Sequence, residues 1–343
     1  MDNSVLKCPE CRGQMRYIAG GGERLECPYC KTKCLVSPSG ALVRQEALKE
    51  LDFAASLAPP KPRSVACGGC GANIVLPLQA SSLPCPYCQN VLVAQSAMAN
   101  NGSAPSALIP LQVDAAEAQH MFLEWLKSTP ADVAQRQKAK RLAPVYFPYW
   151  TFDARVSGTY CVRIEREGEN GRTETSTCTD SISKHFDDVL VPASESVPHA
   201  LLYGLEPWHL DKLEPYRVEF VTGVPIENAS LDLSRGRQLL EERIRQKTED
   251  AIRKIPGVDD AKITSMDIQL DDVKFRHILL PLWVGSVERG DKEYPFVING
   301  RSAEVRGEVP IAARDIVSLI VTLLKYALLI YLGFKVLGFL LFR

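Results

Sequence analysis

The pattern of apolar and polar positions along residues 108–311 alternates between a helical and a strand period. In "DAAEAQHMFLEWLKS" apolar residues recur at helical spacing and predict a helix from about residue 114. These residues are Ala118, Phe122, Trp125 and Leu126. A second stripe predicts a longer helix over about residues 231–255, and it comprises Leu240, Ile244, Ala251, Ile252 and Ile255.

Segments in which apolar and polar residues alternate flank these helices. After residue 145, "VYFPYWTFDARV", "GTYCVRIERE" and "RTETSTCT" predict strands, and "AKITSMDIQL" and "FRHILLPLWVGSVERGDKEYPFVING" predict more. A four-residue loop at "GENG" would place Cys161 opposite Cys178, whereas a two-residue turn at Asn170-Gly171 would not. Helices and antiparallel hairpins in separate blocks indicate an α+β domain with antiparallel sheets over residues 108–311.

A short motif recurs within this domain. Pro-x-Trp occurs at Pro148/Trp150 and again at Pro281/Trp283, each time after a helical stretch and before a hairpin. We therefore expect two similar halves, over residues 108–222 and 223–311. Tryptophans at such positions are more often core residues than ligand contacts.

The last apolar block is "IVSLIVTLLKYALLIYLGFKVLGFLLFR". Its residues 316–342 carry only two charges, Lys325 and Lys335. A helix of that length reaches about 40 Å, more than the about 30 Å of a hydrocarbon core. We therefore predict a C-terminal transmembrane tail anchor over residues 314–343, with the lipid bilayer as a partner and an oligomer formed through this helix. A helix lying in the interface is the competing interpretation, but it needs a broader polar face.

The N-terminal third has a different composition. Two cysteine-rich segments, residues 1–38 and 64–94, are separated by a predicted short helix and a Pro-rich linker over residues 39–63. A small and polar stretch, residues 95–107, reads as a flexible linker. No signal-peptide pattern is present at the N-terminus. The predicted localisation is the inner (plasma) membrane, single-pass, with the N-terminal domains in the cytoplasm.

The cysteines carry the clearest chemistry. Of 11 cysteines, eight form four Cys-x-x-Cys pairs, and each pair has a second pair 14 or 15 residues away. A redox dithiol such as that of a glutaredoxin needs only one pair, whereas two pairs at this spacing are typical of a structural zinc ribbon. We predict two structural Zn²⁺ ions. Their ligands would be Cys8, Cys11, Cys27 and Cys30 in the first ribbon, and Cys67, Cys70, Cys85 and Cys88 in the second.

One cysteine of the first ribbon, Cys34, is left over by this assignment. It is either an alternative ligand or, more commonly, a small packed hydrophobe.

The charge of the chain limits the classes of partner that we expect. The net charge is −1, and ribbon 1 has only a modest basic excess. Residues 64–99 contain no charged side chain. A phosphate-binding surface needs Lys or Arg, so nucleic acid is not an expected partner and protein partners are favoured.

Several motifs together resemble a family of bacterial proteins. They are "LIPLQV", "VYFPYWTFDA", "DDVLVPAS", "HILLPLWVGS" and "VINGRSAEVRGEVP", in this order. The set is similar to that of transcription-factor-B-type zinc-ribbon proteins, often labelled primosomal or helicase-like. One departure is Ala303, where that family usually has Gly, which puts one turn in doubt. Membrane-tethered members resemble anchors for flotillin-like (SPFH) or phage-shock-type proteins, so the resemblance implies such partners.

These observations favour a membrane-anchored zinc-ribbon adaptor that recruits partner proteins to the cytosolic face of the membrane. The alternative is a membrane-tethered nucleic-acid-binding zinc-ribbon protein. An enzyme is not expected: the sequence has no GxxxxGK[ST], HExxH or GxSxG motif. The best acid–base candidate is "KHFDD", with His185, Asp187 and Asp188, and a solvated loop is the more common interpretation of such a segment.

Overall fold

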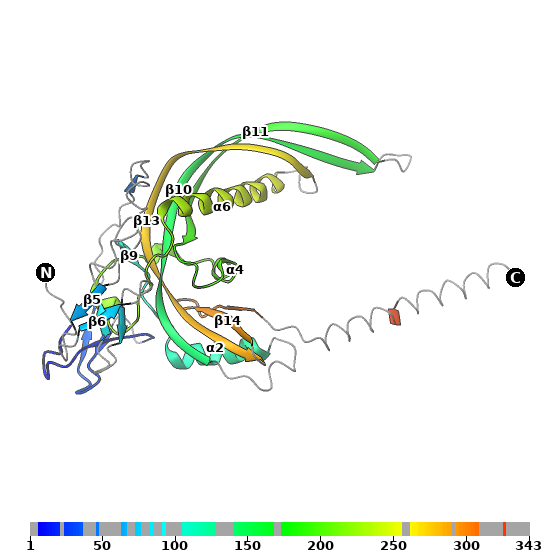
Figure 1. The fold of residues 1–343 in the computed structure, drawn as a ribbon. Helices are drawn as coiled ribbons and strands as arrows, with labels where there is room; N and C mark the ends of the chain where they lie inside the picture. Colours follow the sequence, from blue (N-terminus) through cyan, green and yellow to red (C-terminus); the bar gives the residue numbers. More distant parts are fainter. Residues whose placement is uncertain are drawn as a thin grey trace.

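A single large and mostly antiparallel sheet forms the centre of the molecule (Figure 1). The computed structural model describes residues 6–20, 24–36, 46–47, 63–66, 73–76, 82–84, 91–93, 105–127, 140–167, 173–255, 261–289, 292–308 and 325–326. The main strands run in the order β11-β10-β13-β14-β15. They are β10 (Lys140–Glu167), β11 (Thr173–Pro192), β13 (Lys262–Arg289), β14 (Lys292–Asn299) and β15 (Val305–Gly307). Short strands β4 (Glu46–Ala47), β9 (Ala107–Leu108) and β12 (Glu214–Pro215) complete it.

The three longest strands are continuous where the sequence predicted several separate ones. β10 and β13 pair with each other from Lys140 opposite Ser286 to Arg163 opposite Lys262. Irregularities in register, including one between Asp153 and Arg155, bend the ladder without ending it. The result is the arch of β10, β11 and β13 in Figure 1, which extends well beyond the packed helices.

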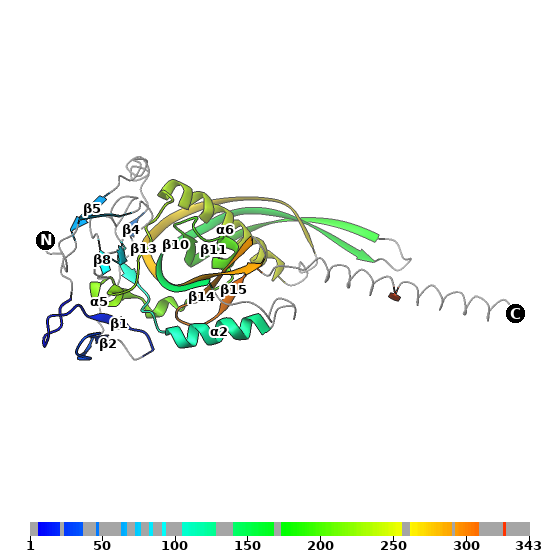
Figure 2. The same ribbon diagram turned by 60° about the horizontal axis from the view of Figure 1, so that its bottom comes forward.

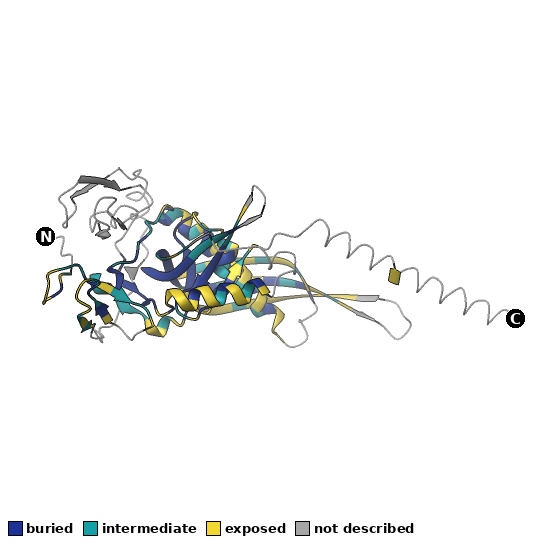
Figure 3. Ribbon diagram, turned by 90° about the horizontal axis from the view of Figure 1, so that it is seen from below, coloured by how far each residue is buried: buried dark blue, intermediate teal, exposed yellow. Residues whose placement is uncertain are grey.

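The two faces of the sheet carry different helices. On one face, the apolar residues of β10 and β13 pack against α2 (Ala115–Lys127) at one end and α6 (Leu233–Arg253) at the other. On the opposite face, Phe147, Tyr149 and Leu280 pack against α4 (His199–Tyr203) and Trp208. Two further helical elements among the described residues are η2 (Leu210–Lys212) and α5 (Val218–Val221). Figure 3 shows buried residues in the middle of the sheet and exposed ones along α2 and the strand ends.

Both long helices form where the apolar period predicted them. α2 buries Ala118, Phe122 and Leu126, and Phe122 stacks on Phe296 of β14 with ring centroids 4.5 Å apart. α6 begins at Asp232, whose carboxylate accepts a hydrogen bond from the Arg235 amide and so caps the helix. The predicted core stripe of α6 is confirmed for Leu240, Ile244 and Ile252.

The two Pro-x-Trp motifs meet in the central ladder. Pro148 lies opposite Leu279, and Pro281 lies opposite Tyr146. A local two-fold axis through the Phe147–Leu280 pair therefore relates the motifs. Trp150 packs in the apolar cluster beside α6 and Trp283 in the one beside α2, so both tryptophans are core residues.

The pairing of β10 with β11 and the turn after β14 test two local expectations. Cys161 pairs with Thr179 and Val162 with Cys178, so the two cysteines are not directly opposite each other. The turn after β14 does form although Ala303 replaces glycine: Ala303 adopts a left-handed φ of 63°, and its amide donates to the Asn299 carbonyl. The Asn299 side chain accepts hydrogen bonds from the amides of Arg301 and Ser302 and holds the same turn.

The short helix predicted within residues 39–63 does not form at Glu46 and Ala47, which are strand β4 and pair with β13. Two larger predictions are also wrong. The fold is mostly antiparallel sheet with few helices rather than α+β, because strands that looked separate run on as long continuous ones. The C-terminal transmembrane helix is the second, and with it the inner-membrane localisation. No helix within the described part of the chain is both long and apolar enough to cross a bilayer. Of the predicted span only Lys325 and Tyr326 are described, as exposed helical residues, and the rest of residues 316–342 lies outside the description.

The contact between α6 and the sheet gives a prediction about stability. A methyl group at Gly236 would lie 2.7 Å from the ring of Trp150. Glycine to alanine within a helix ordinarily stabilises it by about 1 kcal/mol. Here we expect Gly236→Ala to lower the free energy of unfolding by about 1–3 kcal/mol, because α6 must move off the sheet. Chemical denaturation measures this, with the exposed Gln238→Ala in the same helix as the control; a stabilised Gly236→Ala would refute the contact.

Candidate metal centre

The first cysteine-rich segment folds into two matching turns on a small sheet, which we call ribbon 1. Its strands are β1 (Arg16–Ile18), β2 (Arg24–Glu26) and β3 (Lys33–Leu35), in the order β1-β2-β3. In the first turn the Cys8 amide donates to the Gly13 carbonyl, and in the second the Cys27 amide donates to the Thr32 carbonyl. Each turn thus places two cysteines of one Cys-x-x-Cys pair on the same side of the chain.

These turns bring four sulfur atoms together. The Sγ atoms of Cys8, Cys11, Cys27 and Cys30 all lie within 4.8 Å of one another, and this group could hold a metal ion. The Sγ atoms of Cys8 and Cys30 are 3.4 Å apart, as are those of Cys11 and Cys27. One cysteine of each pair is buried and the other is exposed. The first predicted ligand set is therefore assembled by the fold.

The thiols of this group differ in acidity. The pKa of the Cys30 thiol is lowered to about 6, because the hydroxyl and the amide of Thr32 donate hydrogen bonds to its sulfur. At Cys11 the backbone hydrogen bond from Gly13 lowers the pKa, but the contacts with Cys27 and Cys30 outweigh it and raise the value to about 12. One thiolate therefore forms readily and makes the next harder to form. Four thiolates at this distance need a cation among them.

The leftover cysteine is not part of the group. Cys34 is half-buried and packs against the apolar cluster that includes Cys8 and Cys27. It alternates with the exposed Lys33 and Leu35 along β3, so its side chain points to the opposite face of the small sheet.

Ribbon 1 is continuous with the core of the large sheet. The buried residues Cys8, Met15, Leu25, Cys27 and Val36 belong to one apolar cluster with residues of β10, β13, α2 and α5. The Tyr17 amide donates to the Thr222 carbonyl, and the Tyr17 ring meets that of Phe220 edge-on at 5.8 Å. Figure 2 shows β1 and β2 beside α5.

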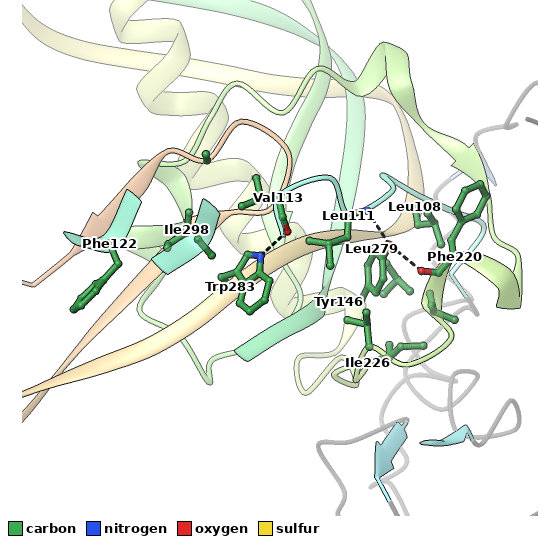
Figure 4. Close-up of a cluster of buried hydrophobic side chains, with 14 of the residues drawn as sticks. Leu108, Leu111, Val113, Phe122, Tyr146, Phe220, Ile226, Leu279, Trp283 and Ile298 are labelled. Carbon is green, nitrogen blue, oxygen red and sulfur yellow. Dashed lines mark hydrogen bonds between the residues drawn. The ribbon is translucent and has the colours of Figure 1, made fainter. Parts of the chain in front are cut away.

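Hydrogen bonds fix the sheet side of this junction (Figure 4). The buried hydroxyl of Tyr146 donates to the Phe220 carbonyl and accepts from the Leu111 amide. Burial raises the pKa of this phenol far above its usual range, so it stays a neutral donor. The Trp283 indole N–H donates to the Val113 carbonyl in the same cluster. Phe220 is therefore held from both sides, by the sheet and by ribbon 1.

The second predicted ligand set, Cys67, Cys70, Cys85 and Cys88, lies outside the described residues. Its flanking strands are described: β5 (Arg63–Ala66) pairs with β6 (Asn73–Leu76), and β7 (Ser82–Pro84) pairs with β8 (Val91–Val93), both antiparallel. The pairs Ala66–Asn73 and Pro84–Val91 bracket the two Cys-x-x-Cys pairs. In ribbon 1 the two Cys-x-x-Cys pairs are bracketed in the same way, by the paired residues Lys7–Gln14 and Glu26–Lys33. In all four cases the two paired residues are seven positions apart.

The predicted acid–base candidate is an exposed ion-pair cluster on β11. His185 Nε2 lies 2.7 Å from an oxygen of Asp187, and both side chains are largely exposed. The Asp188 carboxylate accepts from the Thr151 hydroxyl and from Arg276, so it braces neighbouring strands. Asp188 therefore joins three strands, whereas His185 and Asp187 contact each other at the surface.

A second polar cluster, around Glu227, has no recognisable sequence motif. Its carboxylate accepts from the hydroxyls of Ser194 and Ser196, and burial raises its pKa. The nearby His199 ring bonds to the Ser194 carbonyl rather than to its hydroxyl. Serine and histidine therefore form no nucleophile–base pair here, and the cluster ties two loops together.

Comparison with known proteins gives one distant relative. No known family matches the chain, and no solved structure does. Over 220 residues the chain is 25% identical to the uncharacterized protein YdjG of Bacillus subtilis (strain 168). The alignment covers 61% of this chain and 64% of that protein, so the chain spans a little under two thirds of the relative's length.

The geometry of the sulfur atoms predicts which cysteines hold metal. Cys27→Ser should abolish metal binding by ribbon 1, because Cys27 belongs to the group of four. Cys34→Ser, a matched change in the same ribbon, should leave the metal content unchanged. Elemental analysis of the purified proteins measures both. A loss of metal in Cys34→Ser equal to that in Cys27→Ser would contradict the assignment.

Proposed function

We propose that this chain is a non-enzymatic adaptor whose two four-cysteine ribbons hold structural Zn²⁺ and present surfaces to partner proteins. The observation that carries the proposal is the position of the first metal centre. Two of its ligands, Cys8 and Cys27, are buried in the same apolar cluster as the sheet residues Leu279 and Trp283. A metal ion at this place would stabilise a rigid module on a rigid platform, which is the role of a structural site.

The choice of zinc follows from the ligands. Four thiolates are the ligand set of structural zinc ribbons, and they leave no position for a substrate or a water molecule. When bound, zinc would supply cross-linking and no chemistry of its own, while Thr32 and Gly13 donate hydrogen bonds to the thiolates. For the second ion, support comes from the flanking strands, whose pairing repeats the register of ribbon 1.

The catalytic alternative has little support in the described residues. The contact between His185 and Asp187 is solvent-exposed. At Ser194 the nearby histidine bonds to the carbonyl, and the Glu227 carboxylate that accepts from the Ser194 hydroxyl is shared with Ser196. Flotillin-like or phage-shock-type partners, implied by the resemblance, stay a prediction.

A nucleic-acid-binding ribbon is the second candidate. Arg12 and Lys31 are exposed beside the metal-binding turns and would favour it. Against it, Lys31 and Lys33 both lie 3.6 Å from the carboxylate of Glu26, which reduces the positive charge that a phosphate would meet. Any binding to DNA or RNA should therefore be lost at moderate salt.

Affinity purification with crosslinking tests the adaptor. The full chain, Cys11→Ser and the surface control His185→Ala would be compared in cells. We expect Cys11→Ser to carry one zinc ion instead of two and to lose proteins that the other two chains retain. Each such protein must also bind the purified chain directly and saturably.

Two outcomes would contradict the proposal. One is an identical set of bound proteins for all three chains, because ribbon 1 would then contribute nothing. The other is co-purification of nucleic acid that resists high salt, which would favour the second candidate.

A further inference from the structure

The small sheet of ribbon 1 has two faces of different chemistry. Side chains alternate between the faces of a strand, and directly paired residues share a face. Tyr17, Leu25 and Cys34 lie on the inner face and pack against the apolar cluster of the large domain. The opposite side, the outer face, carries Arg16, Ile18, Arg24, Glu26, Lys33 and Leu35.

The outer face combines exposed aliphatic surface with positive charge. Leu35 is 75% exposed, the highest value among the exposed large hydrophobic residues of the described chain. It lies opposite the exposed Arg24, which in turn lies opposite Ile18. Three cations against the single carboxylate of Glu26 leave this face positive, whereas the whole chain has a net charge of −1.

Glu26 also orders one of these cations. It lies opposite Arg16 on one side and Lys33 on the other, and its carboxylate is 3.6 Å from the Lys33 Nζ atom. The adjacent metal-binding turn and the buried inner face fix the same strands. The outer face is therefore an ordered surface, and ordered surfaces bind with a smaller entropic cost.

We infer that the outer face of ribbon 1 docks an acidic segment of a partner protein that carries aliphatic side chains. Asp or Glu of the partner would pair with Arg24, Lys33 and Arg16, while its aliphatic residues would cover Leu35 and Ile18. This inference rests on the proposed adaptor function and names the surface and the kind of segment.

A protein segment fits this face better than a nucleic acid does. Single-stranded nucleic acids gain affinity by stacking bases on aromatic side chains, and the strands of the outer face carry none. The exposed Tyr29 of the same ribbon lies in the second cysteine turn, with its ring against Gly13. Leu35 and Ile18 offer nothing to a phosphate group but can bury the side chains of a peptide.

Fluorescence anisotropy with defined peptides tests the inference on the purified full chain. The probe is a short fluorescein-labelled peptide of alternating Glu and Leu, compared with alternating Lys and Leu and alternating Glu and Ser. We expect the Glu/Leu peptide to bind at least about tenfold more tightly than either of the others. A similar loss should follow from the double variant Arg24→Gln/Lys33→Gln and from Leu35→Thr, which keeps strand propensity.

The matched control is Lys127→Gln, which removes an exposed lysine from α2 and should bind like the unmodified chain. Metal content must be unchanged in every variant, so that a loss of binding is not a loss of fold.

Equal binding of the three peptides, or unchanged binding by the variants, overturns the inference. If these variants retain the cellular partners that Cys11→Ser loses, the adaptor function stands and the outer face is excluded as its site. Tight binding of a thymidine oligonucleotide that the same variants abolish would also overturn it.

Discussion

The antiparallel ladder between β10 and β13 determines where nearly everything else in the molecule lies. It joins residues that are 99 to 146 positions apart, so its formation carries a large loss of chain entropy, which burial of side chains on both faces must offset. Each ladder strand then continues into a hairpin, β10 with β11 and β13 with β14. The local two-fold axis at Phe147 and Leu280 places Trp150 and Trp283 on the same face of the sheet. There Trp150 packs in the apolar cluster beside α6 and Trp283 in the one beside α2.

Ribbon 1 depends on this ladder through one small patch. Tyr146 and Leu279 present the apolar surface, and the Tyr146 hydroxyl fixes Phe220 by a buried hydrogen bond. Phe220 then supports Tyr17, and through it the sheet that carries the cysteines. A ribbon of this size buries too little surface to be stable alone, so a metal ion in the four-cysteine group would add to the stability that the platform supplies. The two contributions would be coupled, because Cys8 and Cys27 belong both to the group that could hold the metal and to the core.

The sequence predicted those parts of the structure whose signals are local. The helical period revealed α2 and α6, and the cysteine spacing revealed the ligands that ribbon 1 assembles. The continuity of the long strands was not predicted, because Gly158 and Asp271-Asp272 are residue types that commonly end a strand. Gly158 is instead a point of close approach, where a methyl group would lie 2.1 Å from the Asp267 carbonyl oxygen. The docking of ribbon 1 on residues 218–224 was also missed, because contacts between distant segments leave no periodic pattern.

Hydrogen–deuterium exchange before and after removal of the metal tests whether the metal centre and the large sheet share one core. The informative amides are that of Tyr17, which donates to Thr222, and that of Val224, which donates to Val221. We expect faster exchange at both amides when the metal is removed, with the central ladder around Trp150 unchanged as an internal reference. Faster exchange confined to residues 6–36, with Val224 still protected, would contradict it, because the ribbon would then unfold without affecting its platform.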